Sequence, residues 1–373
     1  QTGSGKTAAF LVPLVSGALR AGAAPLEEGP VCPTSLILAP TRELCQQITV
    51  EAMKLCYRTP IRIVPIYGGA EVMPQMQHLA EGCDLAICTP GRLEDFVDRG
   101  VMGVERVEHL VLDEADRMLD MGFAPQIRRI VSGYGMPPPR QEGEGDGGGR
   151  RQTMMFSATF PDEIQELAKE FLDPSYLWIG VGSVGTASTN VDQRFADVST
   201  TDDDGRFAIL VEKLRAEGTE DGPLGGLREM TKGTKTYSLA QGKTLIFANS
   251  KGSVEDVSWR LVGSHIKAKQ IHGGLSQTVR ERALSDFRDG RIGVLVATDV
   301  AARGLDLPGI DHVVNYELPF TAEDYVHRIG RTGRIGNTGV ATSLVGASEP
   351  ALKGIVEAAK SQQADGAAPL PKW

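Results

Sequence analysis

Short apolar segments rich in β-branched residues alternate along the chain with longer segments of helical periodicity. In the first half the short segments are Ser35 to Ala39, Arg62 to Tyr67, Leu85 to Thr89, His109 to Leu112 and Thr153 to Phe156. In the second half they are Thr244 to Phe247, Lys267 to Ile271, Gly293 to Ala297, His312 to Asn315 and Val340 to Leu344. Helical patterns such as Glu43 to Leu55 and Gln277 to Phe287 lie between them. This alternation predicts two tandem α/β domains, each a mostly parallel sheet with helices on both faces.

Three stretches interrupt the alternation. Residues 136–150 hold three prolines and five glycines, and too little apolar surface to offset the entropy of ordering them. Residues 216–242 are similarly rich in Gly, Thr and charge, and residues 181–192 lack periodicity. The sequence therefore predicts a first domain over 1–180 with an unfolded insertion at 136–150, a linker at 181–192, a second domain over 193–350 with an insertion at 216–242, and a tail at 351–373.

Composition narrows the class of protein. The 373 residues are 41% hydrophobic, which is enough for two cores, and no apolar run approaches the roughly 18 residues of a membrane helix. Five cysteines without paired spacing fit a reducing compartment and argue against zinc. The net charge of -9, with the acid excess in the first half, means that any polyanion must be bound locally.

The strongest chemical signal lies at the start of the chain, where Gly3 to Thr7 read Gly-Ser-Gly-Lys-Thr and lead into a helical pattern. In a phosphate-binding loop the backbone N–H groups converge on phosphate oxygens, the lysine adds positive charge, and the threonine hydroxyl holds magnesium. A flexible loop ahead of a helix is the alternative. The pattern predicts an ATP site formed by Thr2, Gly3, Ser4, Gly5, Lys6 and Thr7.

A carboxylate pair suited to this site follows about a hundred residues later. The apolar strand His109 to Leu112 runs into Asp113 and Glu114. At the end of a buried strand, Asp113 can hold the water shell of a magnesium ion, and Glu114 can orient or deprotonate an attacking water. An acidic helix start is the alternative.

The second half of the chain supplies positively charged residues that could act on the same phosphates. Helical spacing from Tyr325 places His327, Arg331 and Arg334 on one stripe about 60° wide, and directs Arg328 away from it. Two guanidiniums on one face can stabilise the negative charge of a phosphoryl group during its transfer. Such arginines raise the rate of hydrolysis by about 10³- to 10⁵-fold. We therefore expect Arg331→Ala to reduce turnover far more than Arg328→Ala. A solvated basic helix face, or a helix that ends at Gly333, is the alternative.

Small polar and glycine-rich turns follow several strands and could meet phosphates through backbone N–H groups and arginine. In the first half they contain Pro40, Thr41, Arg42, Gly69, Thr89, Gly91 and Arg92. In the second half Gln277 and Arg280 open a helix, and Thr298 follows a strand. Aromatic residues make up only 6% of the chain and do not alternate with the basic ones, so we expect contacts to the nucleic-acid backbone without sequence preference.

In order along the chain, the motifs GSGKT, PTREL, TPGR, DEAD, SAT, LIFANS, ATDVAARGLD and HRIGRTGR resemble those of the DEAD-box ATP-dependent RNA helicases. The segment Arg151 to Leu172 resembles the Vasa-like branch in particular. The similarity extends from Gln1 to about Ser343. It implies two RecA-like domains with MgATP in the cleft between them and single-stranded RNA across both. It also implies a monomer that binds single-stranded and duplex RNA and ribonucleoprotein partners and no membrane. We expect it inside the cell, in the cytoplasm, the nucleus or both, with the cytoplasm favoured.

The resemblance also implies residue roles. Gly3 to Thr7 would bind the phosphates, Thr7 and Asp113 the magnesium, and Glu114 the water. Ser157 and Thr159 would link hydrolysis to strand separation, Asp306 would help close the nucleotide site, and His327 would bridge beside the arginines Arg331 and Arg334. The RNA contacts would come from Pro40, Thr41, Arg42, Gly69, Thr89, Gly91, Arg92, Gly273, Gln277, Arg280 and Thr298.

One departure from the family pattern concerns the beginning of the sequence. It starts after the element that reads adenine and after the strand that leads into the phosphate-binding loop, and it lacks an initiator Met. We therefore expect a fragment of reduced stability and weak ATPase activity. An RNA-stimulated ATPase and helicase is the leading hypothesis. A nucleotide-gated RNA clamp with little turnover and a DNA translocase are the alternatives.

Overall fold

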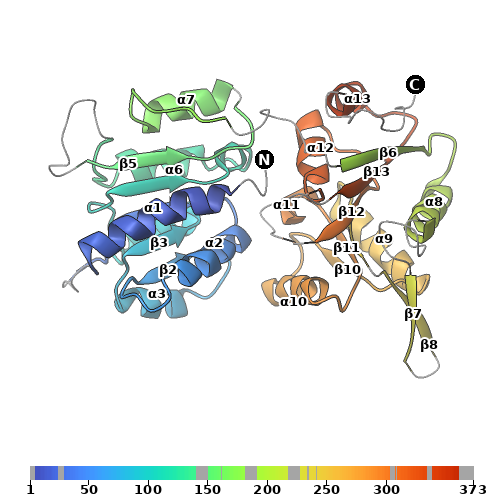
Figure 1. Cartoon of the computed structure of the whole chain (residues 1–373), viewed down its shortest axis with the longest axis horizontal. Helices are drawn as coiled ribbons and strands as arrows, with labels where there is room; N and C mark the ends of the chain where they lie inside the picture. Colours follow the sequence, from blue (N-terminus) through green and yellow to red (C-terminus); the bar gives the residue numbers. More distant parts are fainter. Residues whose placement is uncertain are drawn as a thin grey trace. The chain divides into compact units, whose positions relative to one another are not determined.

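The computed structural model describes residues 5–23, 29–139, 150–160, 162–180, 191–216, 227–232, 235–240, 242–302, 307, 309–333 and 338–360. The chain folds as two compact units, which we call the N-terminal unit (Ser4–Val184) and the C-terminal unit (Gly185–Trp373). Each unit is described by itself, and Figure 1 gives the labels of its elements. None of the helices in these ranges combines the length and apolar character needed to cross a bilayer.

The N-terminal unit alternates strands and helices along the chain. Its strands are β1 (Ser35–Leu38), β2 (Ile63–Ile66), β3 (Leu85–Cys88), β4 (His109–Leu112) and β5 (Gln152–Met155). Its helices are α1 (Lys6–Ala21), α2 (Arg42–Leu55), α3 (Val72–Ala80), α4 (Pro90–Asp98), α5 (Ala115–Asp120), α6 (Ala124–Ser132) and α7 (Asp162–Phe171).

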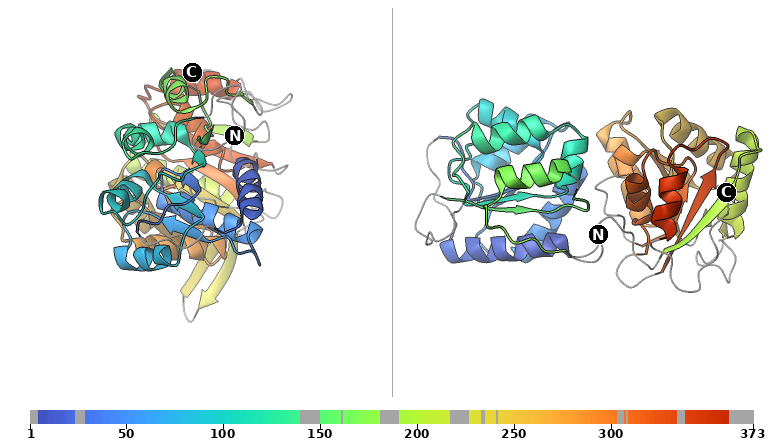
Figure 2. Two further views of the ribbon diagram at one scale, coloured as in Figure 1. Left: turned by 90° about the vertical axis from the view of Figure 1, so that its left-hand side faces the viewer. Right: turned by 90° about the horizontal axis from the view of Figure 1, so that it is seen from above.

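The five strands of this unit form one parallel sheet in the order β2-β3-β1-β4-β5. Alternate residues of β1 face opposite sides: Ile37 packs with α1 and α2, whereas Leu36 and Leu38 pack with the cluster formed by α3 to α7. In the right-hand view of Figure 2, α1 (blue) lies on one side of the strands and the green helices lie on the other. Because the strands are parallel, the loops after all five meet at one edge of the sheet.

The C-terminal unit repeats this plan. Its strands are β6 (Val191–Asp197), β7 (Leu227–Lys232), β8 (Lys235–Ala240), β9 (Lys243–Phe247), β10 (Ala268–Ile271), β11 (Val294–Ala297), β12 (Ile310–Asn315) and β13 (Gly339–Val345). Its helices are α8 (Asp203–Ala216), α9 (Lys251–Gly263), α10 (Gln277–Arg288), α11 (Asp299–Ala302), α12 (Ala322–Ile329) and α13 (Leu352–Lys360).

Six strands of this unit form a second parallel sheet in the order β10-β11-β9-β12-β13-β6. Ile246 of β9 faces α8 and α9, and its neighbours Leu245 and Phe247 face α10 and α11. Helices α12 and α13 cover β13 and β6 through Tyr325 and Ile355. The prediction of two parallel-sheet α/β domains is confirmed.

Three expected boundaries differ from the structure. The expected unfolded insertion at 216–242 contains an antiparallel pair, β7 with β8, because its two halves carry Leu, Met, Thr and Tyr at strand-like spacing on either side of Gly233. Val191 and Asp192, which were expected in the linker, belong to β6, which pairs with β13. The expected tail includes α13, whose residues Ile355 and Ala359 are buried against the unit.

Candidate nucleotide and RNA sites

The described part of the phosphate-binding loop leads into α1. Gly5 takes a left-handed conformation (φ 82°) and caps the helix without a side-chain hydrogen bond, and Lys6 and Thr7 follow in the first turn. Glycine adopts this φ without strain, and the first-turn N–H groups of α1 remain available for an anion. Thr2, Gly3 and Ser4, predicted in the same site, lie outside the described residues.

Asp113 lies where β4 ends and is only 4% exposed. Burial, and secondarily the charge of Glu114, raise the pKa of this carboxyl to about 7, whereas Lys6 acts to lower the pKa. A buried carboxyl that is costly to ionise fits a cation position, because a divalent ion favours its charged form.

Glu114 is held in an unusual backbone conformation. Its φ of 52° and ψ of 53° lie in the left-handed region, which costs an ordinary residue on the order of 1–3 kcal/mol. Its Oε2 accepts a hydrogen bond from Nη1 of Arg117 at 2.6 Å, and Arg117 is 4% exposed. Sequence reasoning missed Arg117, although its position three residues after Glu114 on a helix was a usable signal.

The SAT segment is connected directly to the same strand end. Oδ2 of Asp116 accepts hydrogen bonds from the backbone N–H groups of Ala158 (3.0 Å) and Thr159 (3.1 Å) and from the Thr159 hydroxyl (3.1 Å). In the described part of the chain, the buried Ser157 hydroxyl has no hydrogen-bond partner. Asp116, which was not among the predicted site residues, therefore ties the loop after β5 to the helix that begins after Glu114.

The predicted RNA residues of the N-terminal unit gather at the ends of three adjacent strands. Nη1 of Arg42 donates to the carbonyl of Gly69 at 2.9 Å. Thr89 accepts from the backbone of Gly68 at 3.2 Å, and Arg92 donates to the carbonyl of Ala70 at 3.2 Å. Pro40 and Thr41 precede Arg42, and Gly91 precedes Arg92, so the structure brings all seven predicted positions into one group of loops.

Gly69 fits this group for a steric reason. Its φ is 70°, and a Cβ atom there would lie 2.7 Å from Nη1 of Arg42. Any other residue would be strained at this φ, and the Arg42 guanidinium would have to shift to make room for its side chain.

The predicted RNA residues of the C-terminal unit lie around the ends of β10 and β11. Gly273 follows β10, and Thr298 follows β11 and donates its backbone N–H to the carbonyl of Ile271 at 3.3 Å. Gln277 and Arg280 lie in the first turn of α10. These four positions therefore belong to the same edge of the second sheet.

The predicted arginine stripe is wrong as a helical argument. Helix α12 ends at Ile329 with Gly330 as its C-cap, so Arg331 lies in the following turn, and the helix does not reach it. The chain turns there because the hydroxyl of Thr332 donates to the carbonyl of Ile310 at 2.6 Å, and because Gly333 takes a φ of 66°. Arg334 and Asp306, predicted in the same site, lie outside the described residues.

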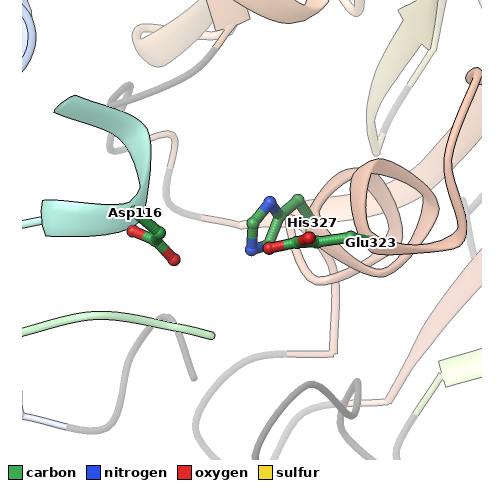
Figure 3. A group of neighbouring side chains, drawn as sticks. All are labelled: Asp116, Glu323 and His327. Carbon is green, nitrogen blue, oxygen red and sulfur yellow. The ribbon is translucent and has the colours of Figure 1, made fainter. Parts of the chain in front are cut away.

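His327 remains on α12, one turn after Glu323. Figure 3 shows the two side chains together on one face of α12, and it shows Asp116 at the beginning of α5. Arg328, which the stripe argument directed away from the site, is buried with 1% exposure and so faces the interior of the unit.

Two parallel-sheet α/β units together with the Gly-Ser-Gly-Lys-Thr sequence are typical of one class of protein, the P-loop nucleoside triphosphatases. Residues 1–167 match the family model of the DEAD/DEAH box helicases, and residues 230–336 match the helicase conserved C-terminal domain. The chain belongs to the DEAD/DEAH box helicases. The two sheets are the tandem RecA-like fold of this family, and the predicted enzyme class, an RNA-stimulated ATPase and RNA helicase, is confirmed.

The chain is similar to several solved structures. The chain is similar to S. cerevisiae Dbp5 bound to RNA and ADP BeF3, with 27% identity, a TM-score of 0.73, and coverage of 98% of this chain and 82% of that one. It is similar to Mss116p bound to ssRNA and AMP-PNP, with 26% identity, a TM-score of 0.71, and coverage of 92% and 65%. It is also similar to a DEAD box protein from Methanococcus jannaschii, with 31% identity, a TM-score of 0.48, and coverage of 97% and 84%.

Proposed function

We propose that the protein hydrolyses MgATP in order to separate short RNA duplexes or to remodel ribonucleoproteins locally. One observation carries this proposal: Asp116 binds the loop of Thr159 directly beside the Asp113 and Glu114 carboxylates. A displacement of Glu114 or α5 during the reaction would therefore move the loop after β5, which contains Thr159. Assignment to the Vasa-like branch rests on the sequence of Arg151 to Leu172 and stays a prediction.

The N-terminal unit supplies the parts that hold the nucleotide. The first-turn N–H groups of α1 and the Lys6 ammonium bind phosphate oxygens, and Thr7 and Asp113 would hold the magnesium ion. Glu114, fixed by Arg117, orients the attacking water. When bound there, magnesium would neutralise negative charge that develops on the phosphates.

The C-terminal unit supplies the cationic residues. Arg331 and Arg334 stabilise the transferring phosphoryl group, with His327 and Asp306 as supporting residues. Because these parts and the phosphate-binding loop lie on different units, we propose that hydrolysis requires the two units to close on the nucleotide. ATP and RNA then each favour the closed state and strengthen the binding of the other.

RNA is held through its backbone. Dbp5 and Mss116p were each solved with RNA, and the two groups of strand-end loops described above offer N–H groups and arginines suited to phosphates. Contacts to the ribose 2′-hydroxyl allow a backbone reader to prefer RNA over DNA. We therefore expect stimulation by RNA of many sequences and weak stimulation by DNA.

The proposal is tested with Glu114→Gln in the full chain. We expect loss of RNA-stimulated ATP turnover by about 10³-fold with ATP and RNA binding retained, because the amide keeps the size of the side chain and loses the base. Glu163→Gln, an exposed glutamate on α7 of the same unit, is the matched control and retains turnover. Release of a short labelled RNA duplex is measured alongside.

The same assay separates helicase from clamp. A helicase releases duplex at the wild-type rate only when Glu114 is present. Equal duplex release by wild type and Glu114→Gln, with neither turning over ATP in the presence of RNA, would favour the clamp and contradict the proposal.

A further inference from the structure

Arg328 occupies the interior of the C-terminal unit and forms a two-pronged ion pair. Its Nε donates to Oδ1 of Asp299 at 2.6 Å, and its Nη2 bonds to Oδ2 of the same carboxylate. Arg328 is 1% exposed, and the side chain of Asp299 is 23% exposed. The two residues lie on different elements, α12 and α11.

The remaining N–H groups of Arg328 bind two further segments. Nη2 donates to Oδ1 of Asn249 at 2.7 Å, and Nη1 donates to the carbonyl of Glu317 at 2.7 Å and to Oδ1 of Asn315 at 3.3 Å. The guanidinium lies over the ring of Phe247, 5.1 Å from its centre. One side chain therefore joins the end of β9, the start of α11, the end of β12 and α12.

The hydrogen bonds of Arg328 depend on the direction of each N–H group, whereas contacts between apolar side chains do not. A guanidinium presents its N–H groups in a fixed planar fork, so all four acceptors must keep their places for every bond to form. A lysine at the same position would carry the charge but could not reproduce the paired contact with Asp299. Arg328 therefore fixes the relative placement of these four segments.

The segments that Arg328 joins carry residues of two proposed roles. Asp299 directly follows Thr298, a proposed RNA contact, whose backbone bonds to the end of β10 beside Gly273. On the other side, Arg328 directly follows His327 and precedes the turn that holds Arg331. The ion pair of Arg328 with Asp299 therefore connects the element that follows Thr298 to the helix that carries His327.

We propose that the Arg328–Asp299 pair is a positioning link that transmits RNA binding at the loop after β11 to His327 and Arg331, and so sets how strongly RNA stimulates ATP turnover. This inference rests on the proposed function. Arg328 is too deeply buried to contact RNA or nucleotide itself. It acts through the residues that flank it.

The test uses Asp299→Asn and Arg328→Lys in the full 373-residue chain. Each variant is assayed for ATP turnover without RNA and with saturating RNA, and for equilibrium binding of a labelled single-stranded RNA without nucleotide. We expect the ratio of stimulated to unstimulated turnover to fall by about 10-fold, within the usual range of coupling between two sites, while RNA binding changes less than about 3-fold. Thermal unfolding shows that each variant is folded.

Tyr325→Phe is the matched control on the same helix. The Tyr325 hydroxyl donates to Gln193 at 2.9 Å and is buried like Arg328, but it does not contact Asp299. The control loses a buried hydrogen bond and keeps the RNA stimulation ratio. A loss of stimulation in Tyr325→Phe equal to that in Asp299→Asn would overturn the inference, because it would show a general effect of weakening the unit.

The outcomes separate the two claims. A wild-type chain whose ATP turnover does not respond to RNA contradicts the proposed function. A wild-type chain that responds, with Asp299→Asn responding equally, overturns the positioning link alone. If Arg328→Lys does not fold, Asp299→Asn decides, since it keeps the size and one acceptor of the aspartate.

Discussion

The two units bury charged side chains in opposite ways. In the N-terminal unit Asp113 is buried so that ionisation is costly, with its pKa raised to about 7 despite the nearby Lys6. In the C-terminal unit Arg328 is equally buried, but a carboxylate, two amide oxygens and a carbonyl satisfy it. A buried charge costs several kcal/mol unless it is compensated. We infer that Asp113, whose charge is only partly compensated, lies where a ligand binds. Arg328, whose charge is fully compensated, stabilises the fold of its unit.

We expect the largest change in stability in the C-terminal unit, where the charge of Arg328 is fully compensated. Arg328→Ala leaves the Asp299 carboxylate and its neighbours without their partner, so we expect the C-terminal unit to lose about 3–5 kcal/mol of stability. Chemical denaturation monitored by circular dichroism measures this. Arg282→Ala, on the exposed face of α10, is the control and changes stability by less than about 0.5 kcal/mol.

The expectation drawn from helical spacing concerned turnover alone, with a far larger loss for Arg331→Ala than for Arg328→Ala. The burial of Arg328 adds an expected loss of stability to it. If Arg328→Ala and Arg282→Ala are equally stable, Arg328 does not stabilise the fold of the C-terminal unit. The comparison between the two units then fails.

We expect a somewhat smaller change in stability, of opposite sign, when Asp113 of the N-terminal unit is replaced. The folded-state pKa of Asp113 lies above its ordinary value of 3.8, so its contribution to stability is present at acidic pH and is lost as the pH rises through about 7. The loss amounts to at most about 4 kcal/mol, at 1.36 kcal/mol per pKa unit. We therefore expect Asp113→Asn to stabilise the ligand-free protein at pH 8, with little effect near pH 4, and to abolish ATP turnover.

Unfolding curves at the two pH values measure the difference. Asp162→Asn, near the exposed start of α7, controls for the general removal of one negative charge. Destabilisation by Asp113→Asn at pH 8 would contradict the interpretation of this carboxyl as a cation position.

The smallest effect concerns the RNA group of the N-terminal unit. Gly69→Ala forces a side chain into a left-handed turn and against Arg42, so we expect a stability loss of about 1 kcal/mol together with weaker RNA binding. Gly100→Ala carries similar backbone strain (φ 65°) where a Cβ meets no neighbour within 4 Å. It should lose stability without losing RNA affinity in a fluorescence titration. Equal loss of affinity in both variants would remove Arg42 and Gly69 from the RNA group.

Local signals in the sequence predicted much of the fold. The β-branched runs became the parallel strands. Thr41, predicted only as an RNA contact, also caps α2 by accepting a hydrogen bond from the backbone of Leu44. The pair β7 and β8 was missed because composition favoured disorder over a weaker strand pattern. The early end of α12 was missed because helical periodicity carries no information about the bond between Thr332 and β12.

Tertiary contacts account for the site residues that the sequence did not predict. Asp116 meets Thr159 only because β4 pairs with β5, which brings two loops about forty residues apart to one edge. Arg328 was directed away from the predicted stripe correctly, but spacing cannot say whether that other face meets water or a sheet. The roles of the phosphate-binding loop, the SAT residues and the RNA loops stay predictions.

The pKa of the Asp113 carboxyl, measured by NMR on the labelled protein with and without MgATP, tests the central claim most directly. The account predicts a value near 7 in the free protein and a marked fall when MgATP binds, because a nearby cation favours the ionised form. An ordinary value near 4 in both states would show that burial does not make the ionisation of Asp113 costly, and would contradict the account.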